Sequence, residues 1–360
     1  MRRLPVFFVV DVSESMVGEP INEVTNGIKS MIATLRQDPN ALETAYLSVI
    51  VFAGRAKTLV PLSDLITFYP PQLPIGSGTS LSAGLRHLMH EMDNKVVKNS
   101  GEIKGDWKPV VFLFTDGVPT DDSEETIRKW EAERKAKTNL VAISVGANTD
   151  ISLLKRLTDN VLILNDMTPD SYRYFFKWIT ASITTQSQKV ELGGNDDFQI
   201  VNLDDEWAKK VESEPKGTHN IDDNYAVLFA KCQKTSAPYL IKYKRNSVDE
   251  WAEILTEEWS AYTRGKYVLN GAYQISSPEE YAELSGTETS NFTVNVNDLE
   301  GFASCPCCAN PYGFAKCFCG GLHCLKGPGE NRCPHCGEMV DYSFEGGGDG
   351  EGFEVGRVQG

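Results

Sequence analysis

The chain has 360 residues and a formal net charge of −15 at pH 7, with 41% hydrophobic and 24% charged residues. These proportions are those of folded globular proteins, and at roughly 150 residues per domain the length predicts two or three domains. The acidic balance argues against binding to nucleic acid or anionic lipid, which depends on basic patches. The apolar run Pro5–Val10 is shorter than the ~7 residues of a signal-peptide core, and nothing reaches the ~18 of a membrane span. We therefore expect a cytoplasmic protein with neither membrane nor nucleic-acid partners.

Residues 1–186 alternate strand and helix patterns and are predicted to form one domain. The near-continuous apolar run Leu4–Val12 is typical of a strand buried on both faces of a parallel sheet. Further strands are predicted at 46–53, 58–62, 109–115, 140–145 and 161–164, and helices at 20–35, 81–97, 123–137, 151–157 and 171–185. The turn between 46–53 and 58–62 is too short for a helical crossover, so this pair should be antiparallel. The order predicts a doubly wound α/β fold whose mostly parallel sheet carries helices on both faces.

The second half of the chain holds most of the negative charge. Residues 1–186 contain 20 Lys and Arg against 22 Asp and Glu, whereas 187–360 contain 15 against 28. Residues 187–222 are predicted to be an acidic linker with one strand at Phe198–Leu203. Residues 223–345 are predicted to form a smaller β-rich domain, with strands at 225–231, 239–243, 266–273 and 292–296 and a short helix at 248–258. The Gly-rich tail 346–360 has little apolar surface and is expected to be flexible.

Hard oxygen donors follow three predicted elements of the α/β domain. The segment Asp11-Val-Ser13-Glu-Ser15 follows the first buried strand, Thr79 lies in a Gly-rich loop before a helix, and Asp116 ends another buried strand. Loops at the carboxyl edge of an open α/β sheet meet where such folds bind ligands. Two carboxylates and three hydroxyls, with no thiol or imidazole, suit Mg²⁺, Mn²⁺ or Ca²⁺. The sequence therefore predicts a cation site made of Asp11, Ser13, Ser15, Thr79 and Asp116.

Each of these segments alone is also compatible with helix capping, because Asp and Ser are favoured N-caps. The combination of three such segments on an α/β pattern favours the metal site. Asp121 and Asp122 come shortly after the motif and are expected to cap the helix that follows them. No histidine, lysine or extra carboxylate in the motifs is an obvious general base. The chemistry therefore favours capture of an acidic side chain of a partner over cleavage of a bond.

Eight of the nine cysteines lie within residues 305–336, and without an export signal such clustering indicates metal binding. The two Cys-x-x-Cys pairs are predicted to hold one structural Zn²⁺ in a closed tetrahedral site, formed by Cys305, Cys308, Cys333 and Cys336. A second zinc would use the residues between these pairs, namely Cys317, Cys319, His323 and Cys324. Whether there are one or two zinc ions stays open, because a free cysteine also packs as a small apolar residue. This zinc-ribbon-like module spans residues 301–342.

The predicted metal sites leave out Cys232, Cys307, His87, His90 and His219. Cys232 stands alone in a predicted strand and is expected to be a core residue, and Cys307 is a weak candidate ligand. His87, His90 and His219 are expected to be ordinary surface or structural residues. A redox role for the Cys-x-x-Cys pairs is less favoured, because two matched pairs suit a metal better than a single active dithiol.

The five-residue oxygen pattern resembles the metal-ion-dependent adhesion site (MIDAS) of von Willebrand factor A (VWA) domains, across roughly residues 4–186. The resemblance implies that the serines and the threonine coordinate the metal, that the aspartates bind it directly or through water, and that the Leu4–Val12 strand is central. With the cysteine module, the chain resembles TerY-type proteins of bacterial tellurium-resistance and stress-response systems. That likeness includes Gly105-Asp-Trp-Lys-Pro109, Thr115–Asp121, Tyr239–Tyr243 and Leu299-Glu-Gly301. One departure is Ala309, where the family has glycine after the second cysteine.

The resemblance implies a non-enzymatic scaffold that binds other proteins through a Mg²⁺ ion and is stabilised by zinc. Its implied partners are a PP2C-like phosphatase and a protein kinase, joined in a phosphorylation-linked signalling unit. One alternative is a VWA cofactor of a separate AAA+ ATPase, since the chain itself has no phosphate-binding Gly-x-x-x-x-Gly-Lys-Ser/Thr loop. Another, less favoured alternative is a metal-assisted hydrolase.

Overall fold

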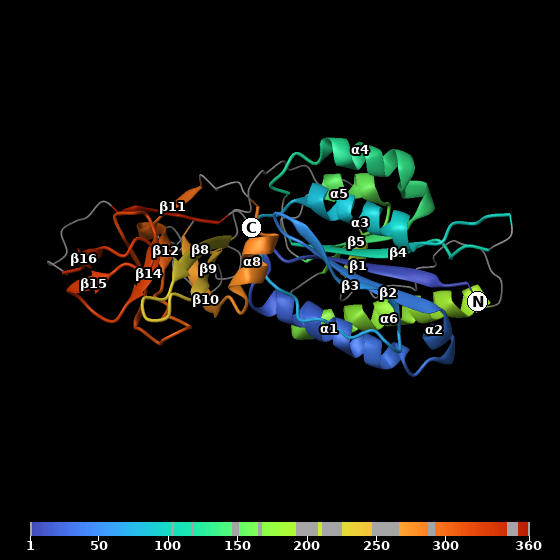
Figure 1. Ribbon diagram of the computed structural model, residues 1–360, viewed down its shortest axis with the longest axis horizontal. Coiled ribbons are helices and arrows are strands. Elements are labelled where there is room, and N and C mark those ends of the chain that lie inside the picture. Colours follow the sequence, from blue (N-terminus) through green and yellow to red (C-terminus); the bar gives the residue numbers. More distant parts are fainter. Residues whose placement is uncertain are drawn as a thin grey trace, which may run out of the picture. The chain divides into compact units, whose positions relative to one another are not determined.

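The computed structural model (Figure 1) describes residues 2–101, 104–116, 119–145, 151–164, 168–191, 208–210, 225–246, 266–286, 292–343 and 352–358. The chain divides into two compact units. The first comprises Met1–Asn220 together with Leu284–Gly286, and the second comprises Ile221–Glu283 and Thr287–Gly360. In the described part of the chain, no helix combines the length and the apolar character that crossing a membrane requires.

A seven-stranded sheet forms the centre of the first unit, in the order β3-β2-β1-β4-β5-β6-β7. Its strands are β1 (Leu4–Asp11), β2 (Ala45–Phe52), β3 (Ala56–Asp64), β4 (Val110–Thr115), β5 (Asn139–Ser144), β6 (Val161–Leu164) and β7 (Ala208–Lys210). β1 is an interior strand, parallel to both β2 and β4, and all of its residues are buried. β3 runs antiparallel to β2, and β7 antiparallel to β6. The predicted mostly parallel sheet and its antiparallel pair are confirmed.

Helices cover both faces of this sheet (Figure 1). One face carries α1 (Glu19–Leu35), α2 (Pro39–Thr44) and α6 (Pro169–Glu191), and the other carries α3 (Leu81–Lys95), α4 (Glu124–Glu133) and α5 (Ile151–Leu157). Along β1, Phe8 and Val10 belong to the core that includes α1 and α6, whereas Phe7 and Val9 belong to the core that includes α3 and α4. Successive side chains of a strand point to opposite faces, so a single apolar run supplies both cores.

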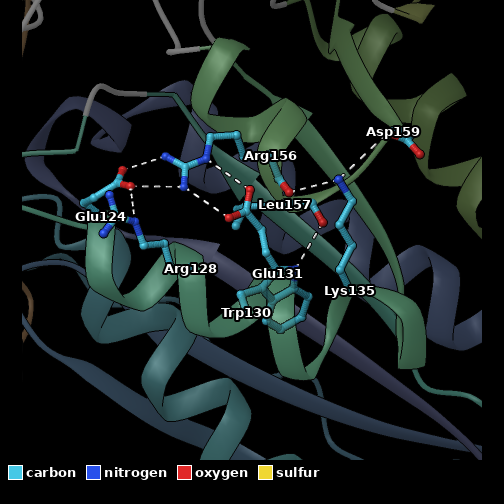
Figure 2. Close-up of polar contacts among 8 residues, drawn as sticks. All are labelled: Glu124, Arg128, Trp130, Glu131, Lys135, Arg156, Leu157 and Asp159. Atoms are coloured by element: carbon cyan, nitrogen blue, oxygen red, sulfur yellow. Dashed lines mark hydrogen bonds and ion pairs between the residues drawn. The ribbon is translucent and has the colours of Figure 1, made fainter.

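Polar contacts at the surface tie α4 to α5 (Figure 2). The Arg156 guanidinium donates to Glu124 at 2.6 Å and to Glu131 at 3.1 Å. The Trp130 indole donates to the carbonyl oxygen of Leu157 at 3.1 Å. Hydrogen bonds to Arg156 hold the pKa of Glu124 and of Glu131 below its usual value, and the same bonds raise the pKa of Arg156. Because these charged groups are well exposed, their attraction is screened and contributes little to stability.

The structure extends the predicted elements of the first unit in three places. α2 is absent from the predicted elements, and it begins after Asp38, whose carboxylate accepts a backbone hydrogen bond at 2.9 Å. α6 continues to Glu191, past its predicted end at residue 185. β7 lies within residues 187–222, the predicted linker, yet it pairs with β6 at the edge of the sheet. The strand predicted at 198–203 lies outside the described residues.

A six-stranded sheet forms the centre of the second unit, in the order β12-β10-β9-β8-β14-β13. Its strands are β8 (Tyr225–Lys231), β9 (Pro238–Arg245), β10 (Tyr267–Gln274), β12 (Leu299–Glu300), β13 (Tyr312–Lys316) and β14 (Leu322–Leu325). Two further pairs are β11 (Thr293–Asn295) with β17 (Glu354–Gly356) and β15 (Glu330–Arg332) with β16 (Met339–Asp341). Short helical segments are α8 (Pro278–Leu284) and the 3-10 turn η4 (Val296–Asp298). The predicted β-rich second part is confirmed.

The C-terminal tail is ordered where it pairs with the rest of the second unit. Val355 in β17 is fully buried and lies opposite Val294 of β11. The prediction that residues 346–360 are flexible throughout is therefore wrong for β17, because this strand pairs with β11 and its flanking backbone bonds to Val296 and Phe292. The helix predicted at 248–258 lies outside the described residues.

Candidate metal centres

Asp11 ends β1 and places a buried carboxylate at the carboxyl edge of the first sheet. Its Oδ1 accepts the Ser13 N–H at 3.0 Å, and its Oδ2 accepts the Thr115 hydroxyl at 2.8 Å. Burial raises the pKa of Asp11 to about 6, although the hydrogen bonds from Ser13 and Thr115 act in the opposite direction. Ionising a carboxylate in such a place costs free energy, and a cation beside it would offset that cost.

A chain of hydrogen bonds joins the loop after β1 to Asp116. The Ser13 and Ser15 hydroxyl oxygens lie 3.0 Å apart, and the Ser15 hydroxyl donates to Oδ1 of Asp116 at 2.9 Å. Asp116 directly follows β4, the parallel neighbour of β1, so the two strands deliver their aspartates to the same edge. The three side chains are buried. The structure thus brings four of the five predicted ligands, Asp11, Ser13, Ser15 and Asp116, together.

Thr79, the fifth predicted ligand, is buried on the loop that precedes α3. Its N–H donates to the Thr120 hydroxyl at 3.1 Å, and its carbonyl oxygen accepts the Thr120 N–H at 2.8 Å. Gly78 has a φ of +87°, a conformation that favours glycine, and its N–H donates to the Glu14 carboxylate at 3.2 Å. The Thr79 loop is therefore fixed against the segments that carry the other four residues.

Glu14 is a third buried carboxylate at this edge, and it is not among the residues predicted from the sequence. It begins the 3-10 turn η1 (Glu14–Met16) and is fully buried. In the pattern Asp-x-Ser-x-Ser it occupies an unspecified position, so the spacing gives no sign that its side chain turns inward. Because its carboxylate accepts the Gly78 N–H, it connects η1 to the Thr79 loop.

The donor set of this edge fits a hard divalent cation. Carboxylate and hydroxyl oxygens are the ligands that Mg²⁺ and Ca²⁺ prefer, and the set contains neither thiol nor imidazole. The residues that would hold the ion are Asp11, Ser13, Ser15, Thr79 and Asp116. When bound, the ion would supply a positive charge and an open coordination position at the edge of the sheet. That these five residues bind a metal stays a prediction.

Asp121 and Asp122 cap two different helices. Asp122 accepts the Glu124 N–H at 3.1 Å, at the start of α4 as predicted. Asp121 instead accepts the Ser80 hydroxyl at 2.8 Å and the Ser82 N–H at 3.1 Å, at the start of α3. The prediction that both residues cap the helix that follows them is therefore wrong for Asp121. Proximity in sequence favours α4, whereas the fold brings α3 within reach.

Eight of the nine cysteines form two clusters in the second unit, and within each cluster the four sulfur atoms lie within 4.8 Å of one another. The inner cluster is formed by Cys232, Cys305, Cys308 and Cys324, and the outer cluster by Cys317, Cys319, Cys333 and Cys336. Pairs of sulfur atoms in the clusters are 3.7 to 3.9 Å apart, far longer than a disulfide bond. Ligands about 2.3 Å from a tetrahedral Zn²⁺ are about 3.8 Å from one another. Both clusters therefore have the dimensions of a closed zinc site.

The grouping of the cysteines differs from the predicted one. The two Cys-x-x-Cys pairs lie in different clusters instead of closing a single site, and Cys232, expected as a plain core residue, completes the inner cluster. His323 belongs to neither cluster. Its Nε2 lies 2.8 Å from the Tyr342 hydroxyl and its Nδ1 lies 3.1 Å from the carbonyl oxygen of Cys324. Neighbouring residues of a strand point to opposite faces, so His323 and Cys324 of β14 cannot both reach one ion.

The same six-residue turn presents three of these cysteines, in segments 232–237, 305–310 and 333–338. In each turn the cysteine N–H donates to the carbonyl oxygen five residues later, and its own carbonyl oxygen accepts the N–H four residues later, all at 2.8 to 2.9 Å. The residue four positions after the cysteine has a positive φ in every case: 56° for Ser236, 60° for Ala309 and 82° for Gly337. The Ala309 departure from the family pattern therefore leaves the turn geometry unchanged.

The electrostatics of the clusters also favour a cation. Burial raises the pKa of Cys317 to about 12 and raises the pKa of Cys324 well above its usual range, with neighbouring cysteines adding to both effects. For Cys232, burial acts to raise the pKa, but hydrogen bonds from Thr235 outweigh it and lower the pKa to about 7. Four thiolates cannot crowd together without compensation, and a coordinated divalent ion provides it.

The two clusters differ in their exposure to solvent. In the inner cluster Cys232, Cys305 and Cys324 are buried and contribute to the main core of the second unit. In the outer cluster Cys319 and Cys336 are exposed, and the other two cysteines belong to a small separate core with Val340. Cys307 lies outside both clusters.

Comparisons with protein families agree with this architecture. A model of the von Willebrand factor type A domain matches residues 6–177, and a model of the TerY-C metal binding domain matches residues 222–360. The chain therefore contains a VWA domain at residues 6–177 and a TerY-C metal binding domain at residues 222–360. Domains of both kinds are typically interaction modules without catalytic activity.

Solved structures similar to the chain align with about half of it. They include a von Willebrand factor type A protein from Catenulispora acidiphila (15% identity, TM-score 0.39), the open form of the pilus adhesin SpaC from Lactobacillus rhamnosus GG (15%, 0.42) and the ArnB paralog VWA2 from Sulfolobus acidocaldarius (17%, 0.35). The matches cover 51 to 52% of this chain and 43%, 30% and 45% of those chains, respectively. The chain thus spans less than half the length of each of these proteins.

Proposed function

We propose that this protein is a metal-dependent interaction scaffold. Its VWA domain would capture an acidic side chain of a partner protein through a Mg²⁺ ion held by Asp11, Ser13, Ser15, Thr79 and Asp116. Its TerY-C domain would be held together by two structural Zn²⁺ ions, one in each cysteine cluster. The observation that carries the proposal is the hydrogen-bonded chain of buried oxygen donors at the carboxyl edge of the VWA sheet.

The donor set explains why a partner carboxylate would be the ligand. Two aspartates balance the charge of a divalent ion, while the hydroxyls of Ser13, Ser15 and Thr79 are neutral donors that occupy positions without adding charge. An octahedral Mg²⁺ ion would then retain a position for an outside oxygen, and a negatively charged one would bind most strongly.

The surroundings of Glu14, the third buried carboxylate at this edge, also favour binding over catalysis. A general base must be free to reach the proton that it removes. Glu14 is fully buried and its carboxylate accepts the Gly78 N–H at 3.2 Å, so it serves the loop structure instead. This supports a non-enzymatic role.

The partners that we propose are a PP2C-like phosphatase and a protein kinase, in a cytoplasmic stress-response unit linked to tellurium resistance. The support for this is the pairing of a VWA domain with a TerY-C domain in one chain. The two domains together fit a role in metal binding and protein interaction.

The test is metal-dependent capture of partners by the full chain. The tagged protein is used to isolate partners from its own host in 5 mM MgCl₂, and the partners are identified by mass spectrometry. We expect Asp11→Ala and Ser13→Ala to lose the captured partner, while Ser30→Ala, an exposed serine on α1, keeps it. Circular dichroism of each variant checks that the fold is retained.

Treatment with a chelator, followed by return of one metal at a time, separates the effects of Mg²⁺ and Zn²⁺ on capture. EDTA followed by dialysis into Zn²⁺ alone should leave capture abolished, and addition of Mg²⁺ should restore it. Undiminished capture by Asp11→Ala, or by the Zn²⁺-only protein, would reject metal-bridged binding. Capture of an AAA+ ATPase in place of a kinase and a phosphatase would reject the proposed partners and keep the scaffold.

A further inference from the structure

The loop that carries Thr79 contacts a short segment from far along the chain. The Ser77 N–H donates to the Ser285 hydroxyl at 3.0 Å, and the Ser77 carbonyl oxygen accepts the Gly286 N–H at 3.2 Å. On the adjoining loop, the Arg55 N–H donates to the carbonyl oxygen of Leu284 at 2.8 Å. Leu284–Gly286 belongs to the first unit by its contacts, although it lies outside residues 6–177 of the VWA match.

Leu284 anchors this segment in the apolar core of the first unit. Its side chain is 1% exposed and belongs to the core that also contains α1 and α6. Two glycines make room for the segment. A Cβ added to Gly76 would lie 2.7 Å from the Leu284 Cβ, and one added to Gly54 would lie 2.1 Å from the Gly286 nitrogen. Because Gly54 and Gly76 have no side chain, Leu284–Gly286 can pack closely beside the Thr79 loop.

Every residue from Gly76 to Thr79 donates its backbone N–H in a hydrogen bond. The Gly76 N–H donates to the carbonyl oxygen of Val12, between Asp11 and Ser13, at 2.8 Å. Gly78 is bonded to Glu14 and Thr79 to Thr120, as described above. Ser77 is the residue of this loop that is bonded to Leu284–Gly286, through both its N–H and its carbonyl oxygen.

We propose that Leu284–Gly286 is a positioning segment of the VWA metal site, which sets the Gly76–Gly78 backbone so that the Thr79 hydroxyl stands at the cation. The proposal rests on the function proposed above. Mg²⁺ requires nearly ideal octahedral geometry, so a ligand displaced by a loop shift contributes little. Residues that orient metal ligands typically change metal affinity by 10- to 100-fold when they are replaced. Leu284–Gly286 would act in this way on Thr79, from about 200 residues away in the sequence.

The test measures Mg²⁺ affinity by calorimetry on the full chain with its zinc retained. We expect Leu284→Ala to weaken Mg²⁺ binding by about 10-fold or more, because it removes the apolar side chain that anchors the segment. Ser285→Ala should weaken binding by a few fold, because it removes the hydroxyl that accepts the Ser77 N–H. Ser285→Thr, which keeps the hydroxyl, should bind like the native protein. Ala282→Ser, at an exposed position of α8, is the matched control.

A second readout separates positioning from general destabilisation. The Tm of each variant is measured without Mg²⁺, and hydrogen exchange is measured for a peptide that covers residues 76–80. Ser285→Ala should leave the Mg²⁺-free Tm within about a degree and accelerate exchange in this peptide. Native Mg²⁺ affinity in both Leu284→Ala and Ser285→Ala would overturn the inference and leave the proposed function standing. Absence of Mg²⁺ binding by the unmodified chain would instead reject both.

Discussion

The two domains of this chain present metal ligands in opposite ways. In the VWA domain, two large apolar cores on either side of a seven-stranded sheet hold the oxygen donors, and these donors already bond to one another. In the TerY-C domain, cysteines of both clusters are themselves part of the core. The main core contains Cys232, Cys305 and Cys324, and a small separate core contains Cys317 and Cys333 with Val340. If the proposed function is correct, a metal is added to an already folded VWA domain, whereas the TerY-C fold should depend on its metals.

The largest expected effect comes from removing a ligand of the inner cluster. Cys232→Ser should reduce the zinc content from two ions per chain to one and remove most of the roughly 10 kcal/mol that a structural zinc contributes to folding. Cys307→Ser is the matched control, because Cys307 lies in the same turn as Cys305 and Cys308 but outside both clusters. Elemental analysis and calorimetric unfolding measure the two quantities. Two zinc ions in Cys232→Ser would contradict the grouping seen in the structure.

The stability of the VWA domain should depend on pH because of the buried carboxylate of Asp11. Because the pKa of Asp11 is raised from 3.8 to about 6, the metal-free fold loses stability as pH rises from about 4 to 6, by up to about 3 kcal/mol. Mg²⁺ competes with the proton, so its stabilising effect should be larger at pH 7.5 than at pH 5. Urea unfolding at both pH values, with and without Mg²⁺, tests this.

Asp11→Asn is the control for that experiment. It cannot ionise, so the metal-free protein should keep its stability between pH 5 and 7.5 at this site, and Mg²⁺ should no longer stabilise it. An equal effect of Mg²⁺ on native protein and Asp11→Asn would show that the ion acts elsewhere.

The two proline-containing cysteine turns offer a smaller and more exact comparison. Ala309 and Gly337 occupy the same position with positive φ, where a Cβ costs about 1 kcal/mol. Ala309→Gly should therefore stabilise the TerY-C domain by about 1 kcal/mol or less, and Gly337→Ala should destabilise it by about the same amount. Chemical unfolding of the two variants gives both values. Changes of the same sign would show that the turns are not equivalent.

The smallest expected effect concerns the surface contacts between α4 and α5 (Figure 2). Arg156→Ala removes hydrogen bonds to Glu124 and Glu131, but these groups are well exposed. We expect the Tm of the VWA domain to fall by about two degrees or less, and this decrease to be smaller still in high salt. Arg128→Ala, which removes a bond to Glu124 within α4, is the comparison. A change that persists in high salt would indicate lost packing instead of lost charge.

The sequence predicts the VWA domain well because its signals are local. The run Leu4–Val12 supplies both cores. Each predicted oxygen ligand lies shortly after a buried strand or shortly before a helix, so the fold brings these residues to one edge of the sheet. Glu14 has no such signal, since only the turn η1 directs its carboxylate inward. The position of Leu284–Gly286 has no local signal either, because the residues that this segment contacts lie more than 200 positions earlier in the chain.

The cysteine grouping could not be predicted because it depends on strand pairing. Equal spacing makes the two Cys-x-x-Cys pairs look like partners, but β14 pairs with β8 and so carries Cys324 toward Cys232. The two clusters also interleave along the chain, with Cys324 lying between Cys319 and Cys333. Spacing alone therefore identifies the ligand type and not the partners.

Hydrogen exchange of the fully metal-free chain tests the central comparison most directly. After both kinds of metal are removed with a strong chelator, peptides from β1, β2 and β4 should remain protected from exchange. Peptides from β8, β9 and β14 should exchange as an unfolded chain does, and Zn²⁺ alone should restore their protection. Protection of both domains without metal, or loss of protection in the VWA sheet, would contradict this account.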